Sequence, residues 1–290
     1  MYGALHVQGN RILDKDNNPV QLKGMSLFWS QWSTAFYNAK TIQYLAKTIQ
    51  CTVVRAAIGD YLINDRHEQI TTVIDAAIAN NIYVIIDWHA HDAVDHKNEV
   101  REFFISMATK YKNVANVIFE IYNEPENQSW SEIKTYAETI IHGIRQTGAN
   151  HLIIVGTSTW CQDVDIAAQD RINDFTNIAY TLHFYAGSHR DELRLKAQTA
   201  LNHGIAIFVT EWGTCDASGN GNLDLQKSEK WIQFMNSNYL SWCNWSVNDK
   251  DETTSALKSG ISSSKPYGPW HSDDLTESDR FVFQKISDEN

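Results

Sequence analysis

The chain has 290 residues, 43% of them hydrophobic and 20% charged, which is the composition of a globular protein with one large core. Its formal net charge of −11 argues against nucleic acids and anionic membranes as partners and favours a neutral substrate. No apolar run approaches the length of a membrane span, and the first residues, MYGALHVQGN, lack a basic segment followed by an apolar one. We therefore expect any secretory signal to lie outside this chain.

The opening segment, residues 5–24, alternates between apolar and polar residues and predicts a small β-hairpin before the first core strand. Strand-like and helix-like segments then alternate to the end of the chain. Most predicted strands are continuous apolar runs, as in parallel strands that are buried on both faces. These strands span residues 20–26, 52–57, 82–88, 117–122, 152–156, 178–184, 206–212 and 239–246.

Between the predicted strands, apolar residues recur at helical spacing. The clearest examples are residues 70–78, 100–111 and 133–144, and residues 276–286 predict a closing helix. Strands and helices that alternate in this way predict an α/β fold, a single (β/α)8 TIM barrel domain over residues 1–290. A doubly wound open sheet is the alternative fold. No composition shift or low-complexity linker indicates a second domain.

Two glutamates follow apolar strands. In VIFEIYNEPENQSW, Glu124 comes just past the fourth predicted strand, and Glu211, in VTEWGT, ends the seventh. Because the C-terminal ends of barrel strands meet at one face, the two carboxyl groups should converge there. Such a pair suits glycoside hydrolysis, in which one group protonates the leaving oxygen and the other attacks the anomeric carbon. Taken singly, each glutamate is also typical of an ion-paired rim residue.

Further polar and aromatic residues are placed at the ends of other predicted strands. They are Arg55 on the second strand, His89 on the third, His183 and Tyr185 on the sixth, and Trp245 on the eighth. Singly, Arg55 is also typical of a core salt bridge, His183 of a hydrogen-bonded core histidine and Trp245 of core packing. Their shared position at one end of the barrel favours a joint functional site.

The segments IYNEP, HFY and VTEWGT and the pattern W-S-V-N-D-K-D-E resemble glycoside hydrolase family 5. The resemblance is strongest to the secreted bacterial-type endo-β-1,4-glucanases of this family, and it runs from the hairpin through at least Leu257. It implies a retaining endo-β-1,4-glucanase, or cellulase, that hydrolyses internal bonds of cellulose and related β-glucans by double displacement. We expect a secreted, monomeric enzyme that binds β-glucan polysaccharide and cello-oligosaccharides and uses no metal or other cofactor.

The resemblance makes Glu124 the acid/base and Glu211 the nucleophile. It implies that Asn123 bonds the sugar 2-hydroxyl and that Arg55 and Tyr185 hold and polarise the nucleophile. Physical reasoning agrees with these roles, because a neighbouring Arg55 should lower the pKa of Glu211. Drier and less positive surroundings should raise the pKa of Glu124, so that this group starts protonated.

The remaining residues of the resemblance belong to sugar binding. His89 and His183 would line the subsite of the scissile sugar, with Trp245 beneath it. Lys250 and Glu252 match residues that hold the second sugar in the family, although a solvated charged loop is the alternative interpretation.

The stretch after the first strand differs from many members of the family. Many relatives have a histidine there, whereas GMSLFWSQW has Phe28 near that point and resembles a subset with the sequence SLFW. We expect Trp32 to be a stacking platform towards the non-reducing end, with Trp29 as its competitor for that role.

The cluster HAHDAVDH offers a metal site as an alternative, since some barrel hydrolases use His-x-His at a strand end. Its candidate ligands are His89, His91, Asp92, Asp95 and His96. Against this alternative, the cluster follows the third strand rather than the first, and no later Asp or His set completes a ligand sphere.

Substrate and redox state each allow more than one interpretation. A non-catalytic sugar-binding barrel would keep the aromatic residues but lose a carboxylate, and both glutamates are present. A mannanase, xyloglucanase or mixed-linkage glucanase could share the same barrel and the same catalytic pair. The four cysteines are far apart and form no CxxC motif, which leaves one or two disulfides open.

Overall fold

Eight parallel strands close into a barrel in the computed structural model, which describes residues 2–59 and 67–287. Each strand pairs with its neighbours in chain order, and the last strand pairs with the first. The closed barrel confirms the predicted fold and excludes the doubly wound open sheet. The strands are β3 (Lys23–Leu27), β4 (Val53–Gly59), β5 (Tyr83–His89), β6 (Val117–Glu120), β7 (Ile153–Val155), β8 (Ile178–Tyr185), β9 (Ile207–Gly213) and β10 (Ser241–Val247).

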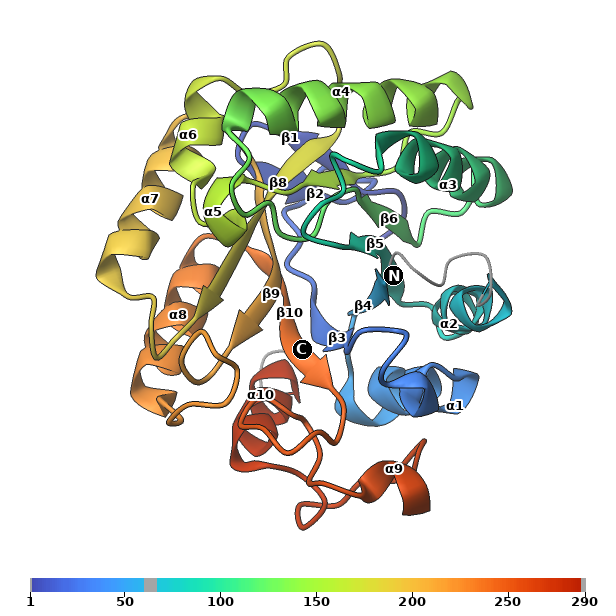
Figure 1. Cartoon of the computed structure of the whole chain (residues 1–290), viewed down its shortest axis with the longest axis vertical. Coiled ribbons are helices and arrows are strands. Elements are labelled where there is room, and N and C mark those ends of the chain that lie inside the picture. Colours follow the sequence, from blue (N-terminus) through green and yellow to red (C-terminus); the bar gives the residue numbers. More distant parts are fainter. Residues whose placement is uncertain (1, 60–66, 288–290) are drawn as a thin grey trace.

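Helices surround the barrel and connect successive strands, as Figure 1 shows. The longest, α4 (Trp130–Gln146), buries residues at helical spacing and begins with a capping box between Ser129 and Glu132. No described helix is long and apolar enough to cross a membrane. The other helical segments are η1 (Thr34–Phe36), α1 (Ala39–Tyr44), η2 (Leu45–Ile49), α2 (His67–Ala79), α3 (Lys97–Lys110), α5 (Ser158–Cys161), α6 (Val164–Gln169), α7 (Asp191–Asn202), α8 (Leu225–Ser237), α9 (Ile261–Ser264) and α10 (Glu277–Ser287).

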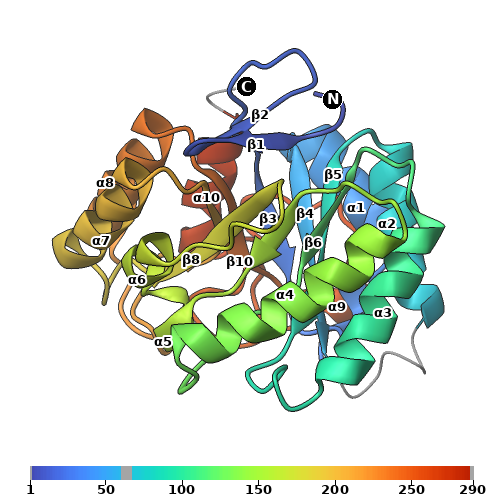
Figure 2. The same ribbon diagram turned by 90° about the horizontal axis from the view of Figure 1, so that it is seen from above.

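The predicted N-terminal hairpin is present and lies across the end of the barrel where the strands begin, as seen in Figure 2. It consists of the antiparallel strands β1 (His6–Gln8) and β2 (Arg11–Leu13). Leu5 and Ile12 join an apolar cluster with strand residues such as Phe208 inside the barrel. The hairpin therefore covers the floor of the core and leaves the opposite end for the polar residues.

The barrel interior changes from apolar to polar towards the C-terminal ends of the strands. Arg55, Asp87, Glu120 and Thr210 are fully buried there and come from four different strands. Arg55 is the third residue of β4 and does not lie at the strand end, which corrects the sequence prediction. Its long side chain, rather than its backbone position, places its charge in the polar layer.

All four cysteines, Cys51, Cys161, Cys215 and Cys243, are buried free thiols. The disulfides that the sequence left open are therefore not formed, and the stability of this barrel comes from its core packing.

Candidate active site

The loop that follows β6 holds Glu124 in a fixed place. The backbone N–H of Asn123 donates to the carbonyl oxygen of Trp88 at 3.2 Å, and that of Glu124 donates to Ala90 at 3.4 Å. On the other side, Gly156 packs so closely that an added Cβ would lie 2.6 Å from the Tyr122 carbonyl oxygen. The loop is thus held between the C-terminal end of β5 and the chain segment that follows β7.

Glu211 projects from β9 and is held by two hydrogen-bond donors. Arg55 Nη1 lies 3.0 Å from one carboxylate oxygen, and the Tyr185 hydroxyl donates to the other at 2.8 Å. Burial nevertheless raises the pKa of Glu211 above its ordinary value, and the nearby Glu124 raises it further, against the lowering by His183, Arg55 and Tyr185. The expected lowering by Arg55 is therefore present but smaller than the cost of burying the charge.

Glu124 has a different environment from Glu211. Its carboxyl oxygen lies 2.8 Å from His183 Nδ1, and no guanidinium or phenol of the described residues donates to it. Burial is the main cause that raises the pKa of Glu124 to about 7, with smaller opposing contributions from His91 and Arg55. At mildly acidic pH the site therefore contains a protonated Glu124 beside a Glu211 that is held by two donors.

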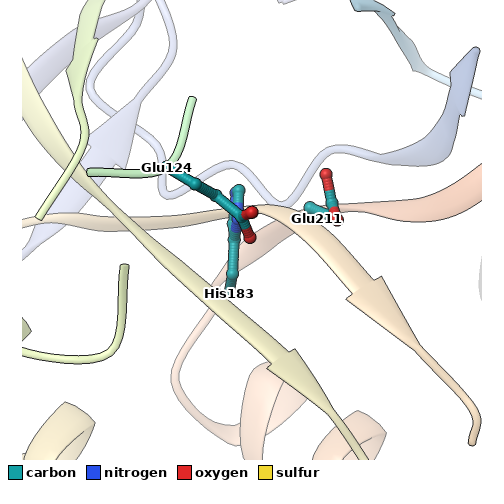
Figure 3. A group of neighbouring side chains, drawn as sticks. All are labelled: Glu124, His183 and Glu211. Atoms are coloured by element: carbon teal, nitrogen blue, oxygen red, sulfur yellow. The ribbon is translucent and has the colours of Figure 1, made fainter. Parts of the chain in front are cut away.

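Figure 3 shows Glu124 directed at the His183 ring, with Glu211 beside them. One ligand atom from each of these three side chains lies within 4.8 Å of the others. This spacing brings the two carboxyl groups close enough to act on the same bond, as the sequence predicted.

Arg55 is the centre of the buried charge network. Its Nε donates to Glu120 Oε2 at 2.7 Å, and Nη2 lies 2.9 Å from Asp87 Oδ2. Nη2 also donates to Asn123 Oδ1 at 2.6 Å, which orients the Asn123 amide and leaves its N–H end for a ligand. Asp87 and Glu120 were missed at the sequence level, because each lies inside an apolar run that predicts only a buried strand.

His89 belongs to the same network and not to an exposed surface. Its Nδ1 lies 2.7 Å from Asp87 Oδ2, and its ring stacks on Trp245 with centroids 5.1 Å apart and planes 13° apart. Burial lowers the pKa of His89 well below its ordinary value, and Arg55 adds to this effect. His89 is thus a neutral ring that packs against the aromatic wall of the site.

Aromatic residues extend from this wall towards solvent. Phe28 packs on Trp245 at 5.3 Å between ring centroids, and Trp32 lies 6.3 Å beyond Phe28. Trp32 is 69% exposed, whereas Trp29 packs against Trp32 and the rings of two histidines. The exposed ring of Trp32 is therefore the better stacking surface of the two.

Lys250 and Glu252 lie in the loop after β10 and form an ion pair at 2.5 Å. The Lys250 ammonium also lies 5.7 Å from the centroid of the Phe28 ring, which brings this loop against the aromatic wall. The Lys250 side chain therefore lies beside Phe28 of the aromatic wall, and the binding role of Lys250 and Glu252 stays a prediction.

Trp160 is a further exposed aromatic residue that sequence reasoning missed. It lies in α5, where Thr159, Trp160 and Cys161 all have positive φ angles. The Trp160 N–H donates to the Pro125 carbonyl oxygen at 2.9 Å, and its side chain is 43% exposed. Its only sequence signal is a tryptophan shortly after a predicted strand, and nothing in the local pattern predicts the left-handed turn that brings its backbone to Pro125.

The alternative metal site is not assembled by the residues for which the sequence suggested it. His89 bonds Asp87, whereas His91 lies near Glu126 and His96 lies between Asp92 and Glu99. Within residues 2–59 and 67–287, the one group with metal-like spacing is Glu124, His183 and Glu211. Both ring nitrogens of His183 and both carboxyl oxygens of Glu211 already have hydrogen-bond partners, so we assign the group to acid–base chemistry.

Comparison with known proteins agrees with this geometry. A sequence model of the family described as cellulase (glycosyl hydrolase family 5) matches residues 13–251. An endoglucanase of Clostridium saccharobutylicum is 46% identical over 99% of this chain and 66% of its own length. Endoglucanase Z of Dickeya dadantii is 48% identical over 87% of this chain and 61% of its own length. The chain thus spans less than two thirds of the length of both relatives.

A solved structure is similar over nearly its whole length. It is a variant of the catalytic domain of Thermobifida fusca endoglucanase Cel5A in complex with cellotetraose. The two structures superpose with a TM-score of 0.93 at 32% sequence identity, covering 98% of this chain and 97% of the other.

The environment of Glu124 generates a direct prediction. In the full chain labelled with ¹³C in its glutamate carboxyl groups, one carboxyl should titrate with a midpoint of about 7, protonated below it and ionised above it. Glu124→Gln should remove this titration, whereas Glu126→Gln, at a more exposed position in the same loop, should leave it in place. A spectrum in which every glutamate titrates near 4 to 5, roughly the ordinary range for this side chain, would contradict the assignment.

Proposed function

The chain belongs to the cellulase family, glycosyl hydrolase family 5, and on this basis we propose that it is a retaining endo-β-1,4-glucanase. It cleaves internal β-1,4-glucosidic bonds of cellulose and related β-glucans. The observation that carries the proposal is the pair Glu124 and Glu211, whose oxygens approach within 4.8 Å while their hydrogen-bond partners differ. Retaining glycosidases need carboxyl groups about 5–5.5 Å apart, because one of them bonds directly to the sugar.

In the first step, a carboxylate oxygen of Glu211 attacks the anomeric carbon. The glycosidic C–O bond breaks, and the proton of Glu124 goes to the departing oxygen. Arg55 and Tyr185 each hold one oxygen of Glu211 and so aim its lone pairs at the carbon. The product of this step is a glycosyl ester on Glu211 and a free chain end.

In the second step, Glu124 is a carboxylate and takes a proton from water. The resulting hydroxide-like oxygen attacks the same carbon, the ester bond breaks, and Glu211 leaves as a carboxylate. Two inversions give net retention of the β configuration. The N–H end of Asn123, oriented by Arg55, donates to the sugar 2-hydroxyl, where the bond strengthens as charge develops on the ring.

Substrate recognition uses aromatic faces and polar edges. Trp32 stacks on a glucose face towards the non-reducing end, and Trp245 packs below the reacting sugar. Lys250 and Glu252 bond hydroxyls at the edge of the second sugar. Trp160, beside Pro125, supplies a ring on the side of the acid/base where the leaving chain departs.

The setting of the enzyme follows from the size of its substrate. Cellulose is a polymer that does not cross a membrane, so we place the protein outside the cell. The 290 residues act as a single catalytic domain that needs no second subunit, since the described barrel carries every group used in the two steps.

The test of the proposed function is a substrate panel of carboxymethyl cellulose, mannan, xylan and xyloglucan. Sugar release should be fastest from carboxymethyl cellulose, because Lys250 and Glu252 border the site as in glucan-binding members. The viscosity of this polymer should fall much faster than reducing ends appear, since cleavage is internal. Faster release of sugar from mannan or xyloglucan would show that this polysaccharide, and not cellulose, is the preferred substrate. A viscosity that falls only in proportion to the cellobiose released would show that the enzyme cleaves from chain ends.

Substitution of the two glutamates should separate their roles. Glu211→Gln should abolish turnover of every substrate. Glu124→Gln should slow cleavage of glucans by about 10²- to 10⁴-fold, the usual contribution of a general acid. With an aryl cellobioside that has a very good leaving group, the Glu124 variant should still accumulate the glycosyl ester, visible by mass spectrometry of the intact protein. Equal loss on both kinds of substrate, in variants that remain folded, would show that the roles are wrong.

Loss of the exposed platform should affect long chains selectively. Trp32→Ala should raise KM for soluble cellulose about three- to tenfold, because a stacked ring contributes roughly 1 kcal/mol. Short aryl glycosides that do not reach Trp32 should be hydrolysed as before. Tyr239→Ala is the matched control, since this 51% exposed ring lies just before β10, at the opposite end of the barrel. The platform assignment fails if both variants, or neither, change KM.

A further inference from the structure

Thr210 lies directly below the active site and contacts three other side chains. It is fully buried in β9, one residue before Glu211. Its Oγ1 lies 2.6 Å from Glu120 Oε1 and 2.8 Å from His183 Nε2, and it is also hydrogen-bonded to the Thr181 hydroxyl. A hydroxyl has one proton to donate and two lone pairs, so Thr210 can donate in only one of these three contacts.

Glu120 determines where the Thr210 proton goes. Arg55 donates to both oxygens of Glu120, through Nε at 2.7 Å and through Nη2 at 3.3 Å. A carboxylate held in this way is ionised and can only accept hydrogen bonds. Thr210 must therefore donate to Glu120, and its two lone pairs accept from His183 and from Thr181. The Thr181 hydroxyl then donates to Thr210 in preference to its more distant acceptor, the Phe208 carbonyl oxygen at 3.3 Å. It follows that Nε2 of His183 carries a proton.

The other nitrogen of His183 then decides the protonation of Glu124. Burial is the main cause that lowers the pKa of His183 to about 4, so the ring is neutral at mildly acidic and neutral pH. With its proton on Nε2, a neutral ring has only a lone pair at Nδ1, and this atom lies 2.8 Å from Glu124 Oε1. Two lone pairs that face each other at this distance repel, so before the reaction the proton between them belongs to Glu124, as the orientation in Figure 3 allows.

We propose that Glu120, Thr210 and His183 form a one-way hydrogen-bond relay that keeps a proton on Glu124, with Thr210 as the positioning residue that selects the His183 tautomer. The inference rests on the proposed function, in which Glu124 must begin the reaction as an acid. The relay opposes ionisation of Glu124, because the resulting carboxylate would face a lone pair. To reach the departing sugar oxygen, the proton of Glu124 must turn away from His183 Nδ1.

Other charges surround Glu124, but its hydrogen-bond partner is His183, the last member of the relay. Among the described residues, His183 alone forms a hydrogen bond to the Glu124 carboxyl, while His91 Nδ1 lies 3.9 Å from it. The charged and titratable groups that interact with it from the surrounding elements are Arg55, Asp87, His91, Glu120, Glu126, Cys161, His183, Tyr185 and Glu211.

The first experiment observes the tautomer in the unmodified protein. In the full chain with ¹⁵N-labelled histidine, we expect the His183 ring to carry its proton on Nε2 throughout the pH range of activity. The signal is assigned from a His183→Asn variant. A ring protonated on Nδ1, or on both nitrogens in this range, would overturn the relay without any need for a mutant that folds.

The second experiment removes the hydroxyl that selects the tautomer. In Thr210→Val, Nε2–H has no acceptor, and the ring can place its proton on Nδ1 and donate to a Glu124 carboxylate. The high-pH limb of kcat/KM should then move to lower pH by about one unit, because a hydrogen bond to a charged group contributes on this scale. The low-pH limb, which reports Glu211, should stay in place, and the histidine signal should change to the Nδ1–H form.

Two matched variants separate the relay from general packing. Thr210→Ser keeps the hydroxyl and should restore both the pH profile and the tautomer. Thr181→Val makes the same chemical change in the neighbouring buried threonine, whose hydroxyl bonds Thr210 rather than His183, and should leave both readouts unchanged. The relay is overturned if a folded Thr210→Val retains the original profile and tautomer, or if Thr181→Val produces the same shift.

Failure of the relay and failure of the proposed function give different results. A protein that releases no sugar from any glucan, yet carries the Nε2–H tautomer, would refute the function and keep the hydrogen-bond assignment. An active glucanase with an Nδ1–H ring would keep the function and refute the relay.

Discussion

The guanidinium of Arg55 is the group on which the rest of the site depends. It is fully buried and contacts three carboxylates, Asp87, Glu120 and Glu211, from three different strands. Burying a charge is costly unless it is paired and hydrogen-bonded, and one cation cannot neutralise all of these anions together with Glu124. The planar fork of arginine makes these contacts in fixed directions, which a lysine ammonium could not reproduce. The excess of carboxyl groups over cations therefore forces an uneven distribution of protons.

The fold determines which carboxyl group keeps the proton. Glu211 projects from β9 over the barrel axis, within reach of Arg55 and Tyr185, whereas Glu124 stands on the loop after β6 and meets only His183 among the described hydrogen-bond partners. The hairpin and the apolar cluster at the opposite end of the barrel supply packing that contributes nothing to this chemistry. Stability and function thus occupy separate layers of one interior, as is usual for this architecture.

The sequence predicted the strands, the helices and the two candidate glutamates because these features are local. Apolar runs predict buried strands, and Asn-Glu-Pro after one such run, paired with a glutamate that ends a later strand, carries the resemblance to the family. Asp87, Glu120 and Thr210 could not be found in this way, since each looks like an interruption inside an apolar run. Their role exists only because barrel closure brings β5, β6 and β9 around one arginine. The direction of the pKa shift of Glu211 could also be found only from the three-dimensional environment, because burial raises this pKa and Arg55 lowers it.

The same charge excess explains how one carboxyl group can be an acid and then a base. In the proposed mechanism, negative charge on Glu124 before the reaction would add to that of Glu211, in a site where several carboxyl groups share a single guanidinium. Formation of the proposed glycosyl ester would remove the charge of Glu211, so that Arg55 would contact one fewer ionised carboxyl group. A negative charge on Glu124 is then less unfavourable in the second step, in which Glu124 must be ionised to take a proton from water. His183 presents the same lone pair in both steps, so the relay favours a protonated Glu124 before the reaction. In the second step, the loss of charge on Glu211 lowers the cost of an ionised Glu124.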